Sequence, residues 1–436
     1  MNDNPRILVI SHNVFSKSTA MGKTLSSMLS CVPPENLAQL YFHSEVPTTA
    51  VCKNYFRITD QNVLNSIVTR RTNYTVFGEQ DIRSDVSSPR TDKGAVAKIY
   101  QFSRRRTPWI YNARNLMWKM GKWNSEALIK WLKDFSPDVI FFASGDYAFS
   151  YQVTYSISVM LQIPVIIWCC DDYYFSKRGM NTPGGRYCHR NLMKWVSRIS
   201  DRTKSVVVIS DRMKRDYSEI FSQPIYTIRI SAPKNQTALP VECRSGIVYV
   251  GSLGINRITP LLELGRQLKT ANISGFECID VYSGDRNEHT ISLLTEDNGL
   301  RFHGSASAEK VPEILGAAKY VLHVEAFDEN SKGRTGYSLS TKIGECLQSG
   351  ACIIAYGPSD ISSIEYLRES RAAVVLSDAE ELPAVLQKMN GRTDEYLKYV
   401  NCAYELAESN HNKEVNDAQM IQIIKDSSCG RNTNET

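Results

Sequence analysis

The sequence has no long hydrophobic run, and its first residues show no secretion signal. Its longest apolar stretches, such as residues 164–170, fall far short of the ~20 residues that a membrane-spanning helix needs. The first ten residues contain no cationic segment followed by a long apolar stretch, so no signal peptide is visible. We therefore expect a cytoplasmic protein, either freely soluble or held at the inner face of the plasma membrane as a peripheral protein.

Paired cysteines and a strong charge of either sign are also missing. The eleven cysteines form no Cys-x-x-Cys motif, and Cys169 and Cys170 are adjacent. This placement is typical of buried free thiols in a reducing compartment rather than of a disulfide framework. A formal net charge of +5 over 436 residues is too small to indicate nucleic-acid binding by itself. We expect no nucleic-acid partner.

Short apolar runs alternate with helical patterns along almost the whole chain. The runs are continuous rather than alternating, which is typical of parallel strands covered on both faces. The expected strands are residues 6–11, 138–143, 165–169, 205–209, 246–251, 278–283, 300–303, 320–324, 351–356 and 372–376. The expected helices are residues 124–134, 152–161, 259–269, 310–317, 341–349 and 362–369. This alternation predicts an α/β protein with two doubly wound Rossmann-like domains that face each other across a cleft.

A polar stretch with two prolines and no periodicity, residues 231–245, suggests where the domains divide. We expect an N-terminal domain at residues 1–230, a linker at 231–245 and a C-terminal domain at 246–400. Residues 401–436 are expected to form a helix followed by a disordered tail. Ligands of such sheets bind outside the carboxyl ends of the strands, so we expect the functional residues at those positions.

The first strand leads into a polar turn and a helix. Gly22, Lys23 and Thr24 resemble part of a phosphate-binding P-loop, but that motif needs a glycine where Lys17 stands. Gly22 remains a candidate for donor binding at a helix start. His12 follows the first strand and is a candidate catalytic residue. The alternative is that both residues belong to an ordinary turn between a strand and a helix and have no functional role.

Adjacent carboxylates follow the strand at residues 165–169. Asp171 and Asp172 could act as a base, contact sugar hydroxyls or cap the turn. A DxD-type metal site needs one residue between the two carboxylates, which is not the case here. We therefore predict no metal and keep Asp171 as a catalytic candidate.

A hydroxyl-rich loop before the expected helix at 341–349 is the most informative segment. Ser338, Ser340 and Thr341 offer hydroxyl donors, Lys342 adds a cation, and Glu345 follows one helical turn later. Together with a helix N-terminus, this set could hold a diphosphate, while the carboxylate accepts hydrogen bonds from a ribose. The same pattern is also compatible with a capped helix start.

A glycine-rich turn opens the second domain. It contains Gly251 and Ser252, and Arg257 follows. Glycine lets a backbone approach a phosphate closely, and arginine can bind it with two hydrogen bonds. Taken alone, this signal is weak.

Considered together, these segments resemble the GT-B glycosyltransferases, in particular the family 4-type enzymes of bacterial capsule and exopolysaccharide synthesis. The resemblance covers most of the chain. It depends on residues 6–24, 137–140, 206–213, 249–257, 323–327, 338–345 and 349–350. It implies a sugar transferred from a UDP- or GDP-sugar donor to a glycan or polyprenyl-diphosphate-linked acceptor, without a metal or other cofactor.

The resemblance also assigns roles to single residues. Glu345 matches the second glutamate of the E-x7-E signature, whereas Tyr337 replaces the first, which departs from the pattern for a retaining enzyme. Arg257 matches the diphosphate-binding arginine, and Lys342 could replace the expected lysine. Phe302, in the strand expected at 300–303, is assigned to the donor site. The alternative is a catalytically inactive scaffold of the same fold that binds a nucleotide or a glycan.

Residues 98–123, which begin with Lys98 and end with Trp123, combine basic and aromatic side chains without any acidic residue. Such a mixture suits the surface of an anionic membrane, where each basic residue contributes about 1 kcal/mol. The hypothesis is that this segment docks the enzyme near a lipid-linked acceptor. A helical hairpin whose aromatic rings pack into the first domain is the alternative.

Overall fold

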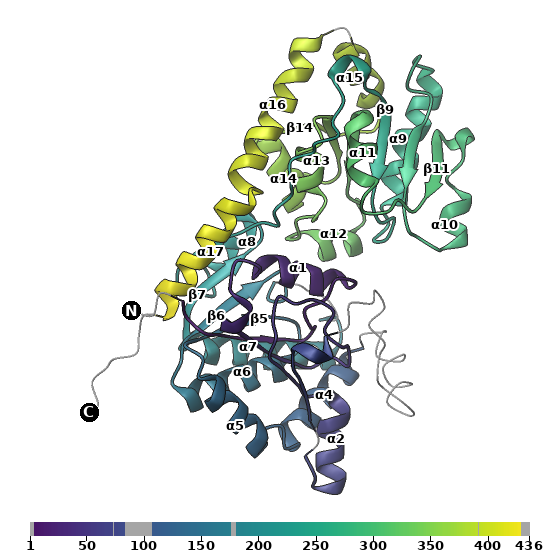
Figure 1. Cartoon of the computed structure of the whole chain (residues 1–436). Coiled ribbons are helices and arrows are strands. Elements are labelled where there is room, and N and C mark those ends of the chain that lie inside the picture. The colour runs from purple at the N-terminus through teal and green to yellow at the C-terminus, as the bar shows by residue number, and fades with distance from the viewer. Residues whose placement is uncertain (1–3, 73, 83–106, 176–179, 391, 429–436) are drawn as a thin grey trace. The chain divides into compact units, whose positions relative to one another are not determined.

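The computed structural model describes residues 4–72, 74–82, 107–175, 180–390 and 392–428. The chain forms two compact units (Figure 1). Unit 1 contains Met1–Ile228 together with Asp417–Thr436, and unit 2 contains Arg229–Asn416. Each unit is an α/β domain with its own sheet.

The sheet of unit 1 has the strand order β4-β3-β2-β1-β5-β6-β7-β8. Its strands are β1 (Ile7–Ser11), β2 (Leu37–Tyr41), β3 (Tyr55–Arg57), β4 (Thr75–Phe77), β5 (Val139–Ala143), β6 (Val165–Cys169), β7 (Thr203–Val208) and β8 (Ile225–Thr227). All neighbours are parallel except β3 and β4, which are antiparallel. The central strands are wholly buried because helices cover both faces of the sheet.

The helices of unit 1 follow from the expected alternation. They are α1 (Ala20–Met28), α2 (Asp60–Thr69), α4 (Pro108–Met120), α5 (Glu126–Phe135), α6 (Ala148–Leu161), α7 (Pro183–Ser200) and α8 (Asp211–Tyr217). The last helix, α17 (Lys413–Ser428), returns to this unit. Its side chains Met420, Ile423 and Ile424 join the same hydrophobic core as α1 and strands β1, β5 and β6.

The sheet of unit 2 has the order β11-β10-β9-β12-β13-β14, and every described neighbour pair is parallel. Its strands are β9 (Ser245–Val250), β10 (Ile279–Tyr282), β11 (Leu300–Gly304), β12 (Ala318–Val324), β13 (Cys352–Tyr356) and β14 (Ala373–Leu376). Its helices are α9 (Ile258–Ala271), α10 (Glu288–Ser292), α11 (Val311–Ala317), α12 (Glu329–Thr335), α13 (Ile343–Leu347), α14 (Ser362–Glu369), α15 (Glu381–Asn390) and α16 (Thr393–Asn410). One hydrophobic core lies on the α9 and α15 face, and another lies on the α11, α13 and α14 face.

The fold class predicted from the sequence is confirmed, since both sheets are parallel-dominated and doubly wound. All ten expected strands are present, whereas β2, β3, β4 and β8 were not predicted. Three of the four missed strands have only three residues, and β2 carries the polar but fully buried Gln39. The segment 341–349 is helical only from Ile343 to Leu347, because residues 341–342 form a turn.

The segment expected as a linker is packed against unit 2. The amide of Ala232 donates to the carbonyl of His411, and the amide of Leu239 donates to the carbonyl of Gly316. The buried Arg244 donates from Nε to the Leu239 carbonyl at 2.7 Å and from Nη1 to the Ser349 carbonyl at 3.1 Å. At the other end of the chain, α17 is ordered through Ser428, and residues 429–436 lie outside the described part.

Every cysteine in the described part of the chain is a free thiol. No helix among the described residues is both long and apolar enough to cross a bilayer.

Candidate functional site

The turn between β9 and α9 is held in a strained backbone conformation. Ile255 and Asn256 both have positive φ, at 58° and 55°, which costs roughly 1–3 kcal/mol for each residue that is not glycine. Asn256 compensates by donating from Nδ2 to Oδ2 of Asp328 at 2.9 Å and by accepting from Thr259 Oγ1 at 2.8 Å. The turn is therefore tied to the start of α12.

The residues predicted for donor binding in this turn have different surroundings. A Cβ atom on Gly251 would lie 2.8 Å from the hydroxyl oxygen of Tyr249, so packing explains the glycine. Ser252 is exposed, and its Oγ accepts a hydrogen bond from the amide of Gly254 at 3.1 Å. The Ser252 hydroxyl hydrogen is available to a ligand, whereas Gly251 serves the turn.

Arg257, at the start of α9, is engaged by a buried carboxylate. Its Nη2 lies 2.9 Å from Oε1 and 3.1 Å from Oε2 of Glu325, which directly follows β12 and is 2% exposed. Burial raises the pKa of Glu325, while Arg257 opposes that rise. The Arg257 side chain is 18% exposed. A phosphate that binds Arg257 must therefore share this cation with Glu325.

A neutral histidine stands beside this ion pair. Burial, together with the charge of Arg257, lowers the pKa of His323 to about 3. His323 Nε2 is 2.9 Å from Ser363 Oγ and 3.8 Å from Glu325 Oε1. At neutral pH, Arg257 is thus the cation that balances Glu325. No role was predicted for Glu325 from the sequence, although an ionisable residue directly after an apolar strand is the signal that could have indicated one.

The hydroxyl-rich loop leads into a very short helix. Ser338 and Ser340 are half-buried, and Thr341 is exposed. Lys342 Nζ lies 3.9 Å from Oε2 of Glu345, and the side chains are 40% and 46% exposed. An exposed pair of this kind contributes ~0–1 kcal/mol. Both charged groups can therefore be released to a ligand at little cost.

The structure brings Arg257 together with Glu325, and Lys342 together with Glu345. Helix α13, which carries Glu345, is closely packed, because a Cβ on Gly344 would lie 2.8 Å from the Cβ of Ala232. The backbone that carries Glu345 is therefore held in place, whereas its side chain is 46% exposed.

Phe302 lies in β11 and packs against the hydrophobic core under α9. This contact gives the ring a structural role, and its assignment to the donor site stays a prediction. Its neighbour His303 stacks on Tyr282, with ring centroids 4.6 Å apart and an interplanar angle of 11°.

In unit 1, Gly22 is buried within α1. A Cβ at this position would lie 2.5 Å from the Cβ of Ser16 and 2.7 Å from both the Thr19 hydroxyl oxygen and the Val14 carbonyl oxygen. The absence of a side chain lets the turn at residues 14–19 fold back onto the helix. The structure thus explains Gly22 by packing, and its role in donor binding remains a prediction.

His12 follows β1 and lies in an aromatic and ionisable cluster. Its ring is 5.4 Å from that of His43 and 5.3 Å from that of Tyr147. His43 Nδ1 is 3.4 Å from Glu45 Oε1, and both side chains are nearly buried. The Arg114 guanidinium covers the Tyr147 ring at 4.1 Å. His43 and Glu45, which the fold brings to His12, were not predicted from the sequence.

The two adjacent carboxylates have separate surroundings. Asp172 Oδ1 accepts from the amides of Tyr174 and Phe175, each at 3.1 Å, and from the Tyr217 hydroxyl at 2.9 Å. Asp172 therefore builds the turn after β6. Asp171 accepts the Asp172 amide at 2.9 Å and is half-buried. Within the described residues, no three histidine, cysteine, aspartate or glutamate side chains gather closely enough to hold a metal ion.

No protein-family model matches the chain, and no curated protein matches its sequence significantly. Solved structures match it over almost its full length. HepE of Anabaena, in complex with UDP, is 12% identical with a TM-score of 0.60, covering 97% of this chain and 100% of that one. Sucrose-phosphate synthase from Thermosynechococcus elongatus is 11% identical with a TM-score of 0.60, covering 97% and 98%.

A UDP-forming α,α-trehalose-phosphate synthase from Burkholderia xenovorans is 10% identical with a TM-score of 0.59, covering 98% of this chain and 100% of that one. At these identities the likeness shows the fold alone. Two parallel, doubly wound sheets in one chain agree with it. The chain therefore has the GT-B fold, built from two Rossmann-like domains.

Proposed function

We propose that the protein is a glycosyltransferase that moves a sugar from a UDP- or GDP-sugar to a glycan or lipid-linked saccharide acceptor. The observation that carries this proposal is the GT-B fold over almost the whole chain, shared with a HepE structure that contains UDP-glucose. The residues at the strand ends of unit 2 support it, since they supply two cations and a carboxylate on an α/β scaffold.

In this proposal Arg257 and Lys342 meet the diphosphate. Negative charge builds there when the bond to the sugar breaks, so fixed cations lower the barrier. Ser252, Ser338, Ser340 and Thr341 donate hydrogen bonds to phosphate oxygens, and Glu345 accepts from the ribose hydroxyls. This set would act without a metal ion or another cofactor.

The stereochemical course is part of the proposal. We expect retention of configuration, in which the leaving phosphate accepts the acceptor's proton, so that no separate base is needed. An inverting reaction would need a base, for which Asp171, Asp172, Asp146 and His12 are the candidates. Anomeric analysis of the product by NMR separates the two courses.

We further propose a role in bacterial surface polysaccharide synthesis, with docking on an anionic membrane through residues 98–123. Residues 98–106 lie outside the described part. Within α4, Trp109, Leu116 and Met120 are exposed. Trp118, however, is buried, and both its Nε1 and Arg114 bind Asp60. These two side chains are engaged inside the domain, so the proposal depends on the exposed ones.

Flotation with vesicles containing anionic lipid tests docking. Protein that stays in the soluble fraction would contradict it. A triple variant with Trp109, Leu116 and Met120 changed to serine should lose flotation while keeping its circular dichroism spectrum.

Calorimetric titration with UDP and with GDP, without added metal, tests the donor site. We expect micromolar binding of one nucleotide, weakened in Lys342→Ala. Absence of binding by folded protein would contradict the donor assignment. The second candidate is an inactive scaffold, which Tyr337 in the place of the first signature glutamate favours. Nucleotide binding without turnover of any UDP- or GDP-sugar would select it.

A further inference from the structure

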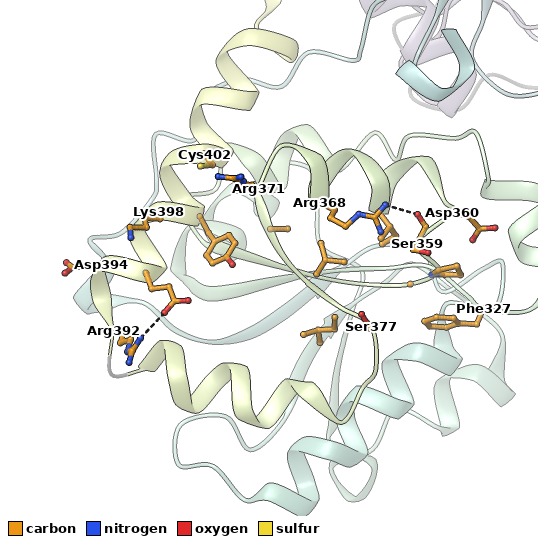
Figure 2. Close-up of a pocket in the computed structure, with 18 of the residues that line it drawn as sticks. Phe327, Ser359, Asp360, Arg368, Arg371, Ser377, Arg392, Asp394, Lys398 and Cys402 are labelled. Carbon is orange, nitrogen blue, oxygen red and sulfur yellow. Dashed lines mark hydrogen bonds and ion pairs between the residues drawn. The ribbon is translucent and has the colours of Figure 1, made fainter. Parts of the chain in front are cut away.

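A large cavity in unit 2 follows the edge of the sheet. It has a volume of about 1430 Å³, larger than the roughly 300–1,000 Å³ of a small-molecule pocket. Its lining includes Arg371 before β14, Ala373, Val375 and Leu376 within it, and Ser377 after it (Figure 2). The cavity therefore forms a groove that runs along β14 from Arg371 to Ser377.

Strand β14 is the last in the sheet order and pairs with β13. An edge strand presents backbone N–H and C=O groups that a further strand can pair with. The lining also includes Ile364 and Arg368 of α14 and Lys398 and Tyr399 of α16. Lys398 lies towards one end of the groove (Figure 2). The lining thus combines apolar and charged side chains beside an edge strand.

The charge of the groove is positive. Its cations are Lys332, Arg368, Arg371, Arg392 and Lys398, and its carboxylates are Asp360, Asp394 and Glu395. Two of the carboxylates are already engaged: Asp360 by Lys332 at 3.4 Å, and Glu395 by Lys388 at 2.6 Å. Within the described part of the chain, neither Arg371 nor Lys398 forms an ion pair.

The part of the groove along β14 lies apart from the donor residues proposed above. Its other end, at Phe327 and Gly357, adjoins Glu325, because a Cβ on Gly357 would lie 3.0 Å from the Glu325 Cβ. Strand β9, which carries the turn with Arg257, is separated from β14 by β12 and β13. Three strand spacings of about 4.8 Å put ~14 Å between the two strands. A simpler explanation for the cations is protection of the edge against aggregation. Protection alone, however, does not require a cavity of this size beside the strand.

We propose that the groove binds an extended acidic peptide segment of a partner protein, which adds to β14 as a further strand. Backbone hydrogen bonds to β14 would supply affinity. Alternate side chains would enter the apolar parts of the groove, and acidic side chains would meet Arg371 and Lys398. The proposal is independent of the sugar-transfer activity.

The test is fluorescence anisotropy with the full chain and a labelled ten-residue peptide of alternating valine and glutamate. We expect saturable binding that weakens at least about tenfold in Arg371→Glu/Lys398→Glu, because two attractive charges become repulsive. The matched control is Arg266→Glu/Lys269→Glu, the same charge change at exposed positions of α9. A peptide of alternating valine and lysine should not bind.

Strand addition itself is tested on the unaltered protein with two N-methylated peptides. One carries methyl groups on the valine amides and the other on the glutamate amides. We expect one of the two to lose binding, because only one edge of the peptide pairs with β14. Equal binding of both overturns strand addition. If hyaluronan oligosaccharides displace the labelled peptide and both methylated peptides bind equally well, the groove is instead a site for anionic glycans. Absence of peptide binding, or unchanged binding in the charge-reversed variant, also overturns the proposal.

Discussion

Replacing Arg257 with alanine is predicted to destabilise unit 2 through the carboxylate that remains. Glu325 is 2% exposed, and both of its oxygens lie within 3.1 Å of Arg257 Nη2. The neighbouring His323 is held neutral by burial, so it cannot replace the lost cation. The variant would therefore contain a buried carboxylate without a partner charge.

The size of the effect follows from the burial of the pair. Removing one partner of a buried pair costs ~3–5 kcal/mol, and the 18% exposure of Arg257 places the cost near the lower end. For a domain of this size, each kcal/mol lowers Tm by ~2–4 °C, so we expect a fall of roughly 6–12 °C at pH 7. Differential scanning calorimetry of the full chain measures it.

The pH dependence identifies the carboxylate as the cause. Burial already raises the pKa of Glu325 in the folded protein, and loss of Arg257 raises it further. A folded state that holds a proton more tightly than the unfolded state gains stability as the pH falls. The difference in stability between Arg257→Ala and the unaltered protein should therefore become smaller as the pH is lowered from 7 towards 5.

Two further variants decide whether this reasoning is correct. Arg257→Ala/Glu325→Gln should recover most of the loss, because the uncompensated charge is gone. Arg301→Ala, which removes an exposed arginine 2.8 Å from Glu296, should change Tm little. An unchanged Tm in Arg257→Ala, or a double variant as unstable as the single one, would refute the argument.

Three other predictions follow from single contacts. Glu345→Ala should raise the donor KM. Lys342→Ala should raise KM and also lower kcat, because that cation would meet the leaving group. Unchanged kinetics in both variants would show that the donor site lies elsewhere. Gly22→Ala should destabilise by ~1–3 kcal/mol through overpacking, whereas Gly145→Ala, with nothing within 4 Å of its new Cβ, should be tolerated; urea unfolding compares them. Burial lowers the pKa of His411 to about 4, so the unfolded state binds the proton more readily than the folded state. The free energy of unfolding should therefore fall by up to about 3 kcal/mol as the pH falls from 6.5 to 4. Urea titrations across this range should show a smaller loss in His411→Gln.

The candidate site could be predicted only in part from the sequence. Lys342 and Glu345 are three positions apart, so helical geometry alone predicts that they meet. The partner of Arg257 could not be predicted in this way, because Glu325 reaches it only when β9 and β12 lie side by side in the sheet. The same limit applies to His43 and Glu45, which the fold brings to His12.

The amino-acid sequence by itself determined the doubly wound α/β class, the central strands of the first sheet and all strands of the second, because continuous apolar runs between helical segments indicate parallel strands covered on both faces. Only the tertiary structure decided which charges are compensated, why Gly22 and Gly251 have no room for a side chain, and that α17 packs on unit 1. It also decided that β14 forms an edge beside an open basic groove. The reason is physical: burial and hydrogen bonding follow from local patterns, whereas ion pairs and cavities depend on contacts between residues far apart in the chain.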